Sequence, residues 1–96
     1  MIETGSIDEL FEQAIAIEQT AQYIYEQFAR LFAPHSAVAA FWTQYAAEEA
    51  QHARWLDRLR ESLTPDQRAT LADPKMLATA HALAQSADLL QNPGCQ

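Results

Sequence analysis

The chain has 96 residues, which fits one small domain and predicts stabilisation by a metal ion or an oligomer. Six Lys and Arg stand against thirteen Asp and Glu, and the net charge of -7 disfavours nucleic acid and anionic membranes as partners. Only two glycines, four prolines and 49% apolar residues indicate an all-α chain and argue against disorder or a β-sandwich.

The single cysteine, Cys95, leaves no intrachain disulfide and no cysteine-based zinc or iron site. The first ten residues have no basic region followed by an apolar run, so we expect no signal peptide. No segment approaches the roughly 20 apolar residues of a membrane span. These features predict a cytoplasmic protein.

The first predicted element is a helix that Ser6 or Asp8 can cap and that runs to about Phe32. Pro34 ends it, and Ser36 is a candidate cap for a second helix that extends to about Leu63. Two long helices joined by so short a connection must lie antiparallel, so residues 6–63 are predicted to form a helical hairpin.

A shorter C-terminal segment, residues 64–91, follows the hairpin. Thr64 is a predicted cap and Pro65 a first helical residue, which gives a short helix to about Leu71. Asp73 and Pro74 interrupt the chain, and an alanine-rich helix is expected over residues 75–90. We expect residues 1–96 to form a single domain.

Both long helices carry an apolar stripe at helical spacing, and acidic residues interrupt it. Glu18 falls within the first stripe, and Glu49 and His52 fall near the middle of the second. Glu48 lies at the edge of that stripe, so we rank it below Glu49 as a ligand. The two stripes are Phe11, Ala14, Glu18, Ala21, Tyr25, Ala29 and Phe32, and Val38, Phe41, Trp42, Tyr45, Glu49, His52, Leu56, Leu59 and Leu63.

A carboxylate removed from water requires a compensating positive charge, and the stripes contain no Lys or Arg to provide it. A metal ion would supply that charge, and Glu49 and His52 form a Glu-x-x-His pair whose side chains project to one point between helices. Carboxylate and imidazole ligands suit iron, manganese or zinc. The alternative is a polar dimer seam that holds no metal.

Two stretches resemble the metal helices of rubrerythrins and related ferritin-like proteins over roughly residues 9–60. They are AIAIEQTAQYIY, residues 14–25, and FWTQYAAEEAQHA, residues 41–53. The resemblance implies that Glu18, Glu49 and His52 bind iron and that Tyr25 stands beside these ligands. Tyr45 is placed with it, as an aromatic residue near the metals that packs in the core or an interface, or that carries electrons.

The chain holds half of the ligand set of such a protein. A complete ferritin-like four-helix bundle supplies about four Glu and two His around two metals, whereas the last predicted helix contains no Glu. Two copies related by a two-fold axis would complete the set, as in the encapsulated ferritins. We therefore expect a four-helix bundle completed by homodimerisation, or a higher homo-oligomer, and the resemblance leaves residence in an encapsulin shell open.

The predicted function is a di-iron ferroxidase that oxidises Fe(II) with dioxygen or peroxide, with two iron ions per dimer interface. Manganese or zinc are candidate substitutes, and iron storage and detoxification both remain open. One alternative is a rubrerythrin-like peroxide reductase that uses an external electron donor, because one cysteine cannot form a four-cysteine redox module. The other is a non-catalytic helical oligomerisation module. His35 is interpreted as a surface histidine, and His81 as an interface histidine or a peripheral metal contact.

Overall fold

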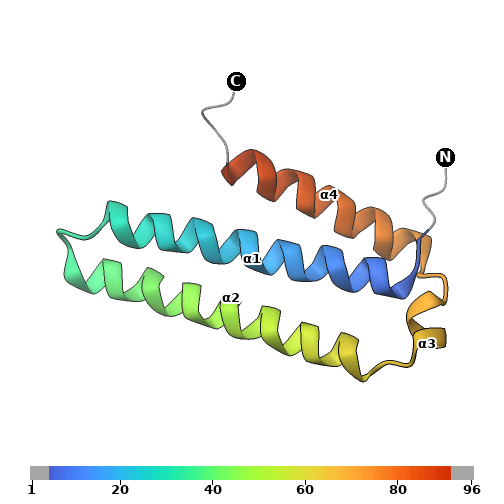
Figure 1. Cartoon of the computed structure of the whole chain (residues 1–96). Coiled ribbons are helices and arrows are strands. Elements are labelled where there is room, and N and C mark those ends of the chain that lie inside the picture. Colours follow the sequence, from blue (N-terminus) through green and yellow to red (C-terminus); the bar gives the residue numbers. More distant parts are fainter. Residues whose placement is uncertain (1–4, 92–96) are drawn as a thin grey trace.

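The computed structural model describes residues 5–91, with side chains described as far as residue 85. Two long antiparallel helices form a hairpin, and two further helices follow it (Figure 1). The all-α fold class, with a helical hairpin and C-terminal helices, is therefore confirmed. The helices are α1 (Ile7–Leu31), α2 (Ser36–Ser62), α3 (Pro65–Ala69) and α4 (Pro74–Gln91).

The helix starts follow the capping chemistry of the sequence, with one exception. Ser6 caps α1, because its side-chain oxygen accepts a hydrogen bond of 3.1 Å from the Glu9 backbone N–H. Thr64 and Gln67 form a reciprocal capping box at α3, with Pro65 in the first turn. The prediction for α2 is wrong by one residue: Ser36 is already helical, and His35 occupies the cap position without a side-chain bond.

The N-terminal end of α1 is tied to the segment that follows α3. The Ile7 N–H donates to the Thr70 carbonyl and the Ala72 N–H to the Gly5 carbonyl, both at 2.8 Å. A β-carbon at Gly5 would collide with the Glu9 side chain and meet Leu77, so glycine permits this close approach. The chain therefore returns to its own start before α4 begins.

A second tie joins the same end of α1 to the end of α2. Arg60 donates two hydrogen bonds to the Asp8 carboxylate, of 2.7 and 2.8 Å. This bidentate geometry fixes the relative position of the two helices along their axes better than a single contact would. The pKa of Asp8 is held below its usual value by that hydrogen bond with Arg60.

The helices form a layer and not a bundle. α1 packs against α2 on one side and against α4 on the other (Figure 1). The molecule measures 50 × 34 × 17 Å, and its smallest dimension is less than the roughly 20 Å that two stacked helices of 10–12 Å diameter would need. Both broad sides of the layer are therefore uncovered, and few described side chains are buried: Ala46, Ala53, Ala72, Leu77 and Ala80.

Within the described residues, no helix is long and apolar enough to cross a membrane. Cys95 lies outside the described residues.

Replacing Leu77 with Ala should release α4 from α1, because Leu77 is the one large described side chain that is fully buried. Loss of a buried leucine side chain costs about 2–5 kcal/mol, and we expect the free energy of unfolding in urea to fall within that range. Leu83→Ala is the matched control, since Leu83 is 53% exposed. A change as large in Leu83→Ala as in Leu77→Ala would contradict this account of how α4 is held.

Candidate metal centre

Three predicted ligands from two helices meet on one side of the hairpin. Glu18 comes from the middle of α1, and Glu49 and His52 come from successive turns of α2. One potential ligand atom from each residue lies within 4.8 Å of the other two. The Nδ1 atom of His52 is 3.6 Å from Glu18 Oε2 and 3.7 Å from Glu49 Oε1. We call these residues the trio; their binding of metal stays a prediction.

The trio is less buried in one chain than the sequence predicted. The side chains are 27% exposed at Glu18, 20% at Glu49 and 57% at His52. The sequence predicted that both carboxylates would be removed from water, but no described helix of a single chain covers this side of the hairpin. The trio is therefore a half-open group at the surface of the layer.

The two carboxylates of the trio lie close together and disfavour each other's charged form. Glu18 Oε2 is buried and has no hydrogen-bonding partner among the described residues. A hydrogen bond with Glu18 raises the pKa of Glu49 to about 7; burial and the negative charge of Glu18 add to the rise, and His52 opposes it. A cation bound between the two carboxylates would remove the repulsion and favour both charged forms.

The donor set fits a transition-metal ion. Two carboxylates and one imidazole are a nitrogen and oxygen set that suits iron, manganese or zinc, and the orphaned Glu18 oxygen offers a free lone pair to such an ion. Three protein ligands are fewer than a closed structural site uses, so positions for water or a substrate remain open. No other group of this kind occurs among the described residues.

A cluster of aromatic rings lies next to the trio on the side of the hairpin loop. Tyr25 stacks on Trp42 at 5.4 Å between ring centroids and approaches Tyr45 at 5.8 Å. Tyr45 lies one helical turn before Glu49, and Tyr25 lies two turns after Glu18. Both tyrosines that we placed beside the ligands are thus in mutual contact. A role in supporting the site remains a prediction.

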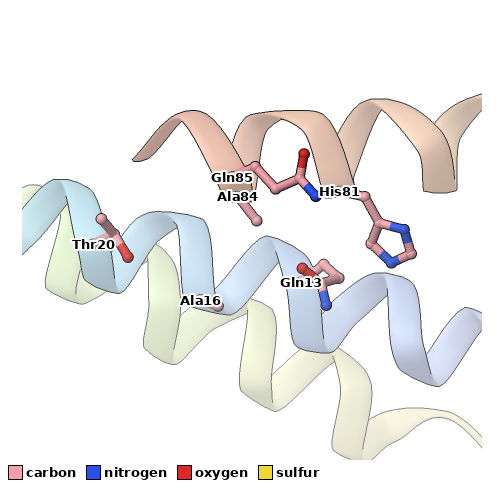
Figure 2. A pocket seen from close by; sticks show the side chains of 6 residues that line it. All are labelled: Gln13, Ala16, Thr20, His81, Ala84 and Gln85. Carbon is pink, nitrogen blue, oxygen red and sulfur yellow. The ribbon is translucent and has the colours of Figure 1, made fainter. Parts of the chain in front are cut away.

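His81 belongs to another part of the molecule. It lines a groove between α1 and α4 together with Ala16 and Thr20 of α1 (Figure 2). Each of these α1 residues is two positions from Glu18, which corresponds to about 200° around the helix. His81 therefore faces the side of α1 opposite the trio. His35 is exposed, in agreement with its interpretation as a surface histidine.

Comparison with known proteins gives one family. The chain matches the model of the rubrerythrin family over residues 9–89. The resemblance seen in the sequence covered roughly residues 9–60, so the match extends through α3 and most of α4. The comparisons with curated proteins and with solved structures give no match.

The raised pKa of Glu49 predicts that the metal-free protein loses stability as pH rises. The folded protein holds this proton more tightly than the unfolded chain, whose Glu49 has a pKa near the usual 4.5. The contribution of Glu49 is therefore complete below about pH 4.5 and is lost as pH rises through about 7. Urea unfolding in EDTA should show a steeper decline over this range for wild type than for Glu49→Gln. Parallel declines in the two proteins would show that Glu49 titrates normally.

Proposed function

The chain belongs to the rubrerythrin family, and from that premise we propose that it is a di-iron ferroxidase whose site forms between two copies. Ferrous ions are the substrate, and each gives one electron to dioxygen or peroxide. The observation that carries the proposal is the convergence of Glu18, Glu49 and His52 on one point, with a Glu18 carboxylate oxygen that has no hydrogen-bonding partner among the described residues.

The count of ligands supports a site shared by two copies. One chain offers two carboxylates and one imidazole. A two-metal site of this fold uses about four carboxylates and two imidazoles. The partial exposure of the trio agrees, because a second copy placed over it would exclude water and strengthen the electrostatic interactions within the site. Two ions per dimer, one for each trio, follow from this count.

Each residue of the trio has a separate task in the proposed site. Glu18 and Glu49 carry the negative charge that attracts ferrous ions, and the acidic chain, with a net charge of -7, favours their approach. His52 completes each set of ligands through Nδ1, the nitrogen that faces both carboxylates. Bound iron would exchange electrons with the oxidant. Glu49, with a pKa of about 7, can release its proton as the ion arrives.

Two alternative functions are compatible with the same fold. A peroxide reductase would use the same trio but would need an external electron donor, since the chain has one cysteine. A non-catalytic oligomerisation module would use only the uncovered apolar side of the layer. The iron titration below distinguishes this last alternative from both redox functions.

Anaerobic titration with ferrous iron should reach one ion per chain in the wild type, with ferric absorbance appearing on exposure to air. Glu49→Ala and His52→Ala should each weaken binding by more than about tenfold, because each removes a ligand. Glu61→Ala and His35→Ala are the controls, since these residues of the same types are exposed and lie away from the trio.

Two results of that titration would reject the proposal. One is the absence of stoichiometric uptake and of ferric absorbance in the wild type, which would favour the oligomerisation module. The other is full binding by both ligand variants, which would move the site elsewhere in the chain.

Metal binding and dimer formation should be linked. A metal ion whose free concentration is about 100 times its dissociation constant stabilises the assembled site by about 2.7 kcal/mol. We therefore expect ferrous iron, added without oxygen, to raise the melting temperature and to move the sedimentation equilibrium from monomer toward dimer. His52→Ala should show neither shift. Equal dimer populations with iron and with EDTA would show that metal binding and dimer formation are not linked.

A further inference from the structure

α2 carries two parallel rows of residues, each spaced alternately by three and four positions. The inner row faces α1 and is buried or half-buried: Ala39, Trp42, Ala46, Glu49, Ala53, Leu56 and Arg60. The outer row is exposed throughout: Val38, Phe41, Tyr45, Glu48, His52, Trp55 and Leu59. Alternate spacing of three and four is the pattern by which one helix packs along another. The outer row therefore has the spacing of a surface that packs against another helix, but no described helix covers it.

A matching row runs along α1. It is apolar at every position and has the same alternate spacing: Ile7, Leu10, Ala14, Ile17, Ala21, Ile24, Phe28 and Leu31. Ring contacts connect it to the outer row of α2 through Trp42. Trp42 meets Phe28 of the α1 row at 4.8 Å and Tyr45 of the outer row at 6.1 Å.

Among its described residues, the opposite side of the hairpin carries no row of exposed large apolar residues like the outer row. Its hollows are lined by charged and amide side chains, among them Gln19, Glu26, Arg54 and Asp57, together with alanines and Ile15. A partner that buries apolar surface would therefore cover the side with the two rows, which is also the side of the trio. Exposed residues of large area, such as Trp55 at 56% and Phe41 at 51%, lie on this side.

The two rows share one centre. The outer row of α2 is centred between Glu48 and Glu49, and the α1 row is centred on Gln19. Asp8 lies opposite Arg60 and Phe28 lies opposite Trp42, so the level of Gln19 corresponds to about Ala50. With a rise of 1.5 Å per residue, the two centres agree to within about 3 Å. The trio lies at the same level.

From this shared centre we infer that a second copy of the chain docks on these two rows, with each helix antiparallel to its own copy. The inference rests on the proposed function, which places the site between two copies. It adds which face of the chain the second copy covers, the relative direction of the helices and the register of their contacts. The two-fold axis lies between the two copies, perpendicular to the helices. It passes α1 at the level of Gln19 and α2 at the level between Glu48 and Glu49, so the two trios lie at one level along the helices.

The register follows from the axis. Val38 meets Leu59 of the partner subunit, and Phe41 meets Trp55 of the partner subunit. Tyr45 meets His52 of the partner subunit, on the side of that ring away from its Nδ1, which already faces carboxylates. Glu48 meets its own copy at the axis. Like charges repel there, so a cation bound nearby favours the docked state.

Single-cysteine variants in a Cys95→Ser background test this register with a maleimide cross-linker shorter than ~10 Å, the usual distance between packed helix axes. Glu48→Cys should cross-link to itself. Val38→Cys should cross-link only when mixed with Leu59→Cys, and Phe41→Cys only when mixed with Trp55→Cys. All five positions are exposed, so the monomer should tolerate the changes. Two independent mixed pairs keep the test decisive if one variant misfolds. Ala47→Cys, exposed on the polar side, is the control.

The reactions are run both in EDTA and with Zn²⁺, which binds such ligands without redox chemistry. Cross-linking of Val38→Cys to itself would show parallel helices and overturn the inference. Cross-linking no stronger than that of Ala47→Cys under either condition would also overturn it, because α2 would then face something other than its copy. Wild-type iron oxidation is measured separately. A correct register without iron oxidation would reject the proposed function alone, and iron oxidation without the register would reject this inference alone.

Discussion

Because α1 lies between α2 and α4 in a single layer, the described helices leave the apolar rows uncovered, and the other main features depend on that constraint. Among the described side chains, burial is confined to four alanines and to Leu77 of α4. The trio stays half-open for the same reason. In a bundle the opposite layer would enclose these groups, whereas here the layer presents them together on one surface.

Two acidic side chains show how differently the fold treats its charges. Asp8 has Arg60 at hydrogen-bond distance, and its pKa is lowered by that partner. Glu49 has another carboxylate beside it, and its pKa is raised to about 7. The first arrangement is complete within one chain and serves to fix the hairpin. The second is costly in one chain, and groups of that kind concentrate at functional sites.

The sequence was sufficient for the hairpin and for the meeting of the trio, because helical spacing determines which side chains share a face. Proline and capping residues located the helix ends to within a few positions. The flat layer could not be predicted, since nothing in the composition of α4 distinguishes packing beside α1 from packing across the hairpin. The tie of Arg60 to Asp8 was missed as well, because it joins residues far apart in the chain. The exposure of His52 was missed because a stripe indicates a face and not what covers it.

The pairing of residues 5–7 with residues 70–72 has a consequence for the order of folding. In an unfolded chain these segments are separated by most of the sequence, and bringing them together has a large entropic cost. Once the hairpin has formed and Arg60 has reached Asp8, only the short segment that contains α3 remains between the end of the hairpin and residues 70–72, which pair with residues 5–7. We therefore expect the hairpin to form first and α4 to dock last. Amide hydrogen exchange would then proceed faster in α4 than in the central turns of α1.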